Sequence, residues 1–74
     1  CERYAELELA IMRRHRLRVA WRDPGRQRVG PLQPRDLVTR NHEEFLIADT
    51  DDGRRLEIRL DRIIRFDTIN PDAA

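Results

Sequence analysis

The chain has one cysteine and two histidines, the side chains that most often ligate zinc with sulfur or nitrogen: Cys1, His15 and His42. They lie far apart in the chain, and neither histidine has a motif neighbour. A zinc site needs about four ligands. No glycine-rich phosphate loop and no nucleophile motif is present in the sequence. The sequence therefore predicts a protein that is not an enzyme, with no catalytic residues, no metal site, no cofactor and no small-molecule substrate.

An acidic run before Gly53 has some likeness to a calcium-binding loop. With Gly53 as the sixth loop position, the first and third positions would be Ala48 and Thr50, which lack the carboxylates that such a loop requires. The Asp52-Gly53 pair instead predicts a two-residue type I′ turn between two strands.

Charge is unevenly distributed along the 74 residues, although the net charge is only +1. Residues 13–40 hold nine arginines against two aspartates, whereas residues 41–53 hold five carboxylates and no arginine. All 15 basic residues are arginines, which indicates either recognition of phosphates and carboxylates or the coding bias of a GC-rich genome. Separate acidic and basic surfaces are expected, and each could select a different partner.

The length and the single cysteine limit the class of protein. A chain of 74 residues forms one domain, and Cys1 alone cannot make an internal disulfide. No apolar stretch approaches the ~20 residues of a membrane span, and no signal peptide is visible. We expect a cytoplasmic protein without membrane contact. Because the first residue is not methionine, the natural N-terminus is expected to lie upstream.

Hydrophobic periodicity predicts one helix followed by strands. Tyr4, Leu7 and Ile11 share one stripe of a helix over about residues 3–14. From Leu17 to Trp21 the period becomes two, which predicts a half-buried strand with Trp21 in the core. A weaker strand is expected over residues 26–32; its prolines predict an edge strand or one that ends early.

Three further segments complete the predicted sheet. Residues 36–38 predict a bend or short strand, residues 44–50 and 54–60 a hairpin, and residues 63–66 a last short strand. The expected fold is α+β, mainly β: a helix followed by a small, five-stranded, strongly bent antiparallel barrel over about residues 16–68, of the Sm-like or OB type. A frayed tail is expected over residues 69–74.

Three segments together resemble the Rof family of Rho-binding antiterminators. Cys-Glu-Arg-Tyr at residues 1–4 and Leu-Glu-Leu-Ala at residues 7–10 resemble the opening of that family. Asp-Leu-Val-Thr-Arg at residues 36–40, and residues 56–63 followed by Phe66, resemble its later segments in the same order. The likeness runs from Cys1 to about Phe66.

The resemblance implies an Sm-like fold and a bacterial transcription regulator that acts through protein–protein interaction. Such a protein would bind the N-terminal RNA-binding region of the termination factor Rho, block RNA loading and inhibit Rho-dependent termination. An acidic surface could compete for a basic RNA cleft. By match to the family motif, the partner-binding residues would be the following: Glu2, Tyr4, Glu6, Glu8, Arg40 and Asn41.

The chain departs from the family in ways that keep a second hypothesis open. Arg3 and Ala5 replace acidic residues, about three extra residues precede Asp36, and relatives are distinctly acidic. The alternative is an Sm-like RNA-binding protein that uses the arginines at 16, 18 and 22. With four aromatic residues and Trp21 expected in the core, direct nucleic-acid binding is not the favoured hypothesis. Tyr4 is expected either against the barrel or at a contact surface.

Overall fold

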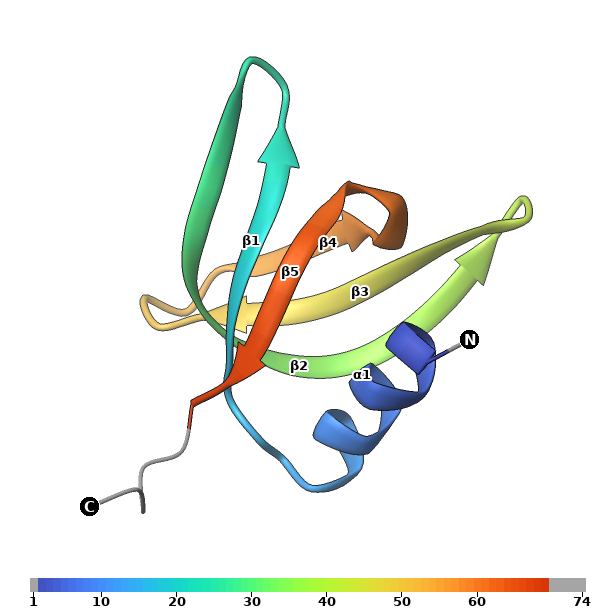
Figure 1. The fold of residues 1–74 in the computed structure, drawn as a ribbon, viewed down its shortest axis with the longest axis vertical. Helices are drawn as coiled ribbons and strands as arrows, with labels where there is room; N and C mark the ends of the chain where they lie inside the picture. Colours follow the sequence, from blue (N-terminus) through green and yellow to red (C-terminus); the bar gives the residue numbers. More distant parts are fainter. Residues whose placement is uncertain (1, 70–74) are drawn as a thin grey trace.

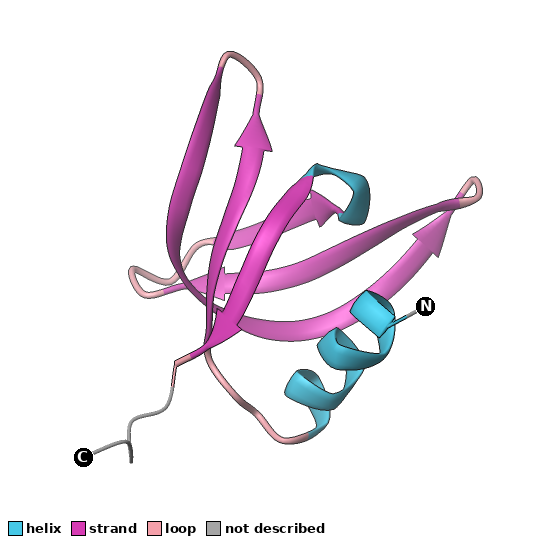
Figure 2. Cartoon of the chain, viewed as in Figure 1, coloured by secondary structure: helices cyan, strands magenta, loops and turns pink. Residues whose placement is uncertain are grey.

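A helix and a five-stranded antiparallel sheet make up the described part of the chain (Figures 1 and 2). The computed structural model describes residues 2–69. In chain order the elements are α1 (Glu2–Met12), β1 (Leu17–Asp23), β2 (Arg26–Arg40), β3 (Glu43–Thr50), β4 (Arg55–Arg59), the 3₁₀ helix η1 (Leu60–Arg62) and β5 (Ile63–Thr68). The predicted α+β, mainly β class is confirmed.

The sheet curls without closing into a barrel. Its strand order is β4-β3-β2-β1-β5, so β4 and β5 are edge strands that do not pair with each other within residues 2–69. β2 causes the curl, because its first half pairs with β1 and its second half with β3 (Figure 1). Leu32 is the residue at which the pairing changes, since it lies opposite both Leu17 and Thr50.

The prediction of a short or edge second strand is wrong. β2 runs for 15 residues through the middle of the sheet and includes the segment expected to be a bend at residues 36–38. Pro31 pairs only toward β1 and Pro34 only toward β3, so each proline lies where one side of β2 is unpaired and a missing N–H is tolerated. A register shift between Pro34 and Asp36 adds a bulge.

Helix α1 lies across the curled sheet and closes the core. Leu7 is fully buried and Ala10 is 5% exposed, in one cluster with Leu17, Val19 and Trp21. Tyr4 and Ile11 are half-buried on the same stripe, as the periodicity predicts. The burial of Trp21, at 7% exposure, confirms its place in the core.

The helix ends at Met12, two residues earlier than expected. Arg14 adopts a left-handed conformation (φ 58°), and the His15 N–H donates to the Ala10 carbonyl at 2.9 Å. This six-to-one bond, together with the Arg14 N–H to the Ile11 carbonyl at 3.1 Å, is a Schellman-type helix end. Arginine takes the position where glycine is usual.

The predicted type I′ turn is not found at Asp52-Gly53, and a turn of that type occurs instead at a place for which none was predicted. Asp52-Gly53 does not form a type I′ turn, because Gly53 has a positive φ (88°) whereas Asp52 does not. Instead the Gly53 N–H donates to the Thr50 carbonyl at 3.1 Å and closes a three-residue loop. Asn41 and His42, with φ of 51° and 66°, have the two positive values that a type I′ turn requires.

The C-terminal part is longer and more ordered than expected. β4 ends at Arg59, η1 follows directly, and β5 continues to Thr68 rather than Phe66. The predicted tail began at Ile69, but the Ile69 N–H donates to the Arg16 carbonyl at 2.9 Å. The rest of that predicted tail lies outside the described residues.

Candidate partner-binding surface

The helix carboxylates predicted to bind a partner lie on two different flanks of α1. Glu6 and Glu8 are both exposed, with fully buried Leu7 between them. Residues two positions apart in an α-helix, such as Glu6 and Glu8, are separated by roughly 160° around the helix axis. A flat partner surface can therefore contact one of these carboxylates closely and not both. Glu2 begins the helix, and its side chain lies outside the described part of the structure.

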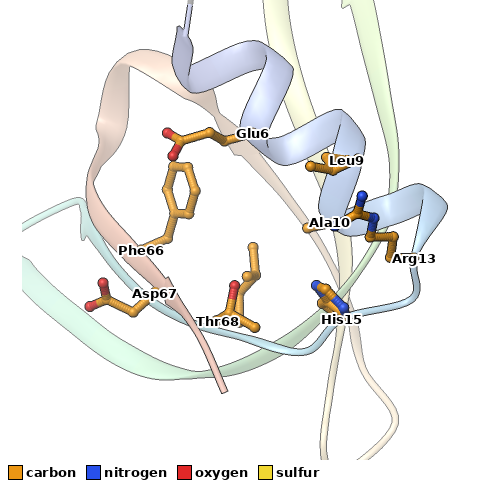
Figure 3. A pocket seen from close by; sticks show the side chains of 9 residues that line it. Glu6, Leu9, Ala10, Arg13, His15, Phe66, Asp67 and Thr68 are labelled. Carbon is orange, nitrogen blue, oxygen red and sulfur yellow. The ribbon is translucent and has the colours of Figure 1, made fainter. Parts of the chain in front are cut away.

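The Glu6 flank faces a groove of ≈ 330 Å³ between α1 and β5 (Figure 3). Exposed Leu9 and half-buried Phe66 lie along it. Its charged groups are of both signs: Glu6 and Asp67 lie at one end of the groove and Arg13 at the other. The groove therefore offers no single charge to a partner.

The other flank carries Tyr4, beside two adjoining hollows of ≈ 410 and ≈ 210 Å³. Both hollows are lined by Glu44 at the start of β3 and by Leu60 and Asp61 of η1. We call the combined area the Tyr4–Glu44 surface; its residues are Arg3, Tyr4, His42, Glu43, Glu44, Arg59, Leu60 and Asp61. Glu8 lies one helical turn after Tyr4 and extends this surface along α1.

Local bonds occupy the two arginines of the Tyr4–Glu44 surface. The Arg3 guanidinium donates to the Ile63 carbonyl at 2.8 Å and ties α1 to the start of β5. The Arg59 guanidinium lies 2.8 Å from Asp61 and 3.3 Å from Glu43. Within the described residues Glu44 and Glu8 form no ion pair. The surface thus presents unpaired carboxylates beside a half-buried tyrosine ring.

The other two predicted residues, Arg40 and Asn41, lie on the β2–β3 hairpin at the border of this surface. Because Leu46 faces the core, Glu44 points to the same side of β3 and Phe45 to the opposite side. The Arg40 guanidinium lies over the Phe45 ring, 5.8 Å from its centroid, and pairs with Glu57 at 2.7 Å. Arg40 therefore lies on the Phe45 side of the hairpin, directly opposite Glu43 in the register, whereas Asn41 is exposed at the hairpin tip.

Sequence reasoning missed the carboxylates that join the helix to the hairpin. Glu43, Glu44 and Asp61 were not among the expected contact residues, although the acidic segment 41–53 contains two of them. The period-two pattern places Glu44 on the same face as Leu46 and was a usable signal. The position of Asp61 depends on η1, which no sequence pattern had indicated.

Asp49 on β3 lies between an arginine of β2 and an arginine of β4, and these ion pairs lower its pKa. Hydrogen bonds from Arg55 at 2.9 Å and Arg35 at 2.8 Å lower the pKa of Asp49 to about 2.

In the part of the chain that the structure describes, no three His, Cys, Asp or Glu side chains could hold a metal ion together. Nor does any helix there have the length and apolar character to cross a membrane.

The fold and these shallow charged hollows define a small binding domain built from a helix and a curled sheet. The sequence matches the model of a family described as modulators of Rho-dependent transcription termination (ROF) over residues 1–74. The chain therefore belongs to the Rof family, whose role is regulatory, and the sequence resemblance is confirmed.

Comparison with solved structures supports the fold. Proteasome accessory factor B/C (PafBC) of Arthrobacter aurescens is similar, with a TM-score of 0.80 and 18% sequence identity. The match covers 90% of this chain and 11% of that chain, so it describes a shared domain fold. No curated protein sequence matches the chain.

Proposed function

We propose that this protein inhibits Rho-dependent termination by binding the N-terminal RNA-binding region of Rho and blocking RNA loading. Membership of the Rof family over residues 1–74 is the observation that carries the proposal. A modulator that acts on Rho in this way works in the cytoplasm, as a protein–protein inhibitor.

The Tyr4–Glu44 surface, extended by Glu8, is the part of the molecule best suited to this contact. Rho's RNA site is built for phosphates, so unpaired carboxylates match its charge. Glu8 and Glu44 supply such carboxylates, and Tyr4 adds an amphipathic ring of the kind enriched at protein interfaces. Asn41 lies at the tip of the adjacent hairpin, whereas Glu6 and Arg40 lie outside this contact area.

A displacement experiment tests the proposal. Purified Rho is loaded with a labelled cytidine-rich RNA at about 150 mM salt, and increasing amounts of the protein are added. The wild-type protein should displace the RNA without binding it appreciably at that salt. RNA that stays on Rho at saturating protein would overturn the proposal.

Charge-reversal variants locate the contact. Glu8→Arg should weaken displacement about a hundredfold, because like charges across an interface cost several kcal/mol. Asp51→Arg is the control for a charge reversal away from α1, because Asp51 is an exposed carboxylate in the loop between β3 and β4 (Figure 1). Asp51 pairs with Arg16, so the melting temperature of this variant is measured as well. Glu6→Arg tests the other helix flank and should act like the control. If Glu6→Arg abolishes displacement and Glu8→Arg does not, the α1–β5 groove is the contact.

A further inference from the structure

Four arginines form a row along the outer face of β1 and the neighbouring end of β5. On β1, Leu17, Val19 and Trp21 face the core, so Arg18 and Arg22 point to the opposite side. Arg65 of β5 lies opposite Ala20, which is between those two residues. Arg62 lines the same hollow of ≈ 430 Å³ as Arg22. Together these four residues make the β1–β5 arginine row.

The four guanidinium groups of the row are available to a partner. All four residues are exposed, and within residues 2–69 none of them forms an ion pair. Several other arginines are engaged: Arg16, which sequence reasoning placed on the basic face, lies 2.6 Å from Asp51. The row is therefore a local excess of positive charge on a chain of net charge +1.

Nearby carboxylates reduce this excess without removing it. Asp67 lies opposite Arg18 in the register, without a salt bridge to it. Asp23 and Asp61 line the hollow of Arg22 and Arg62, but they pair with Arg28 and Arg59. Asp67 also lies two residues from Arg65 on the same face of β5, so within the described residues it is the one unpaired carboxylate beside four positive charges.

We propose that the β1–β5 arginine row binds the phosphate backbone of single-stranded RNA, independently of the Rho contact. A linear row of unpaired guanidinium groups fits a linear polyanion, and arginine forks match phosphate geometry. Trp21 is buried, so the row offers no aromatic platform for bases. The recognition is therefore of backbone charge and not of sequence. Arg18 and Arg65 lie on the sheet face opposite α1, so this end of the row can bind RNA while Rho is bound. Arg62, at the other end, directly follows Asp61 of the Tyr4–Glu44 surface.

Salt dependence is the measurable signature of such binding. For single strands, log Kobs falls with log salt with a slope of about −0.7 per neutralised phosphate. Four contacts predict a slope of about −2.8. Arg18→Gln with Arg65→Gln should bring the slope to about −1.4, since two contacts are lost while the apolar stems are partly kept.

The experiment measures fluorescence anisotropy of labelled oligouridylate and oligocytidylate between about 20 and 100 mM salt, below the salt of the displacement assay, and without Rho. The matched control is Arg35→Gln with Arg54→Gln, because these two arginines are exposed, ion-paired and outside the row. The control should keep the wild-type slope, and both oligonucleotides should bind equally. No binding at the lowest salt, an equal loss in the control, or tighter binding to polyglutamate than to RNA would each overturn the proposal. The Rho displacement assay with the R18Q/R65Q variant should give the wild-type result, so the two proposals fail separately.

Discussion

Both signs of charge occur around the Tyr4–Glu44 surface and around the β1–β5 arginine row, but local bonds leave carboxylates unpaired at the first and arginines unpaired at the second. In the Tyr4–Glu44 surface, Arg3 donates to a backbone carbonyl and Arg59 pairs with two carboxylates, so Glu44 stays unpaired. In the row, Asp23 and Asp61 pair with arginines outside it. The charge that a partner meets thus depends on which neighbours a side chain can reach. A net charge of +1 does not reveal it.

The largest effect is expected for Trp21. If this ring were exposed, it could stack on nucleic-acid bases, and the arginine row would not be limited to backbone charge. The ring is 7% exposed, and the Arg28 guanidinium lies 5.4 Å from its centroid. Trp21→Ala should lower the free energy of unfolding by about 3–5 kcal/mol. Urea denaturation followed by circular dichroism measures the loss. An unchanged unfolding midpoint would place Trp21 on the surface.

Glu44→Arg sharpens the boundary of the Tyr4–Glu44 surface. The charge reversal at an exposed position should weaken Rho binding about tenfold, whereas stability should change by no more than about 0.5 kcal/mol. Glu57→Arg, on β4 and outside the Tyr4–Glu44 surface, is the control. Calorimetric titration of Rho measures the affinity. Equal affinities for the two variants would remove Glu44 from the contact.

The turn at the tip of the β2–β3 hairpin borders the Tyr4–Glu44 surface and has two non-glycine residues at positive φ, Asn41 and His42. A left-handed conformation costs such a residue about 1–2 kcal/mol, and glycine avoids most of it. His42→Gly should therefore raise stability by about 1 kcal/mol and the melting temperature by about 4–8 °C. Thr39→Gly, within an extended strand, should instead destabilise. A lower melting temperature for His42→Gly would contradict the type I′ assignment.

Asp49 belongs to a third region, in which carboxylates and arginines pair with each other. We expect the smallest effect here, on the pH dependence of stability. Hydrogen bonds from Arg55 and then Arg35 lower its pKa from 3.8 to about 2. Because the folded pKa is below the unfolded one, the stabilisation is complete above pH about 4 and is lost as pH falls toward 2. Between these pH values the free energy of unfolding should fall more for the wild-type protein than for Asp49→Asn. Parallel pH profiles would show that the network does not stabilise the fold.

Sequence patterns predicted the elements better than their connections. The helix stripe through Leu7 and the buried face through Leu17 and Trp21 follow from periodicity, and the structure confirms both. The course of β2 could not be read in this way, because a strand paired on one side at a time tolerates prolines that a fully paired strand excludes. The helix end and the β2–β3 turn were not predicted, because they require positive φ at Arg14, Asn41 and His42. None of these residues is a glycine, which is the usual sequence signal for positive φ.

The candidate site was predictable only in part. The family resemblance indicated Tyr4 and Glu8, which lie on one flank of α1, but it also grouped them with Glu6 and Arg40, which the fold places elsewhere. The contribution of Asp61 required the three-dimensional position of η1 beside the helix. Whether each residue contacts Rho remains a proposal for the variants above to test.

Calorimetric titration of Rho with this protein, repeated at increasing concentrations of a cytidine-rich RNA, tests the central claim most directly. If the protein and RNA compete for one site, the apparent Kd of the protein should rise in proportion to the free RNA concentration. This follows from linkage, since each ligand must weaken the other equally. An apparent Kd that does not change with RNA would contradict the account, because it would place the protein at a different site on Rho.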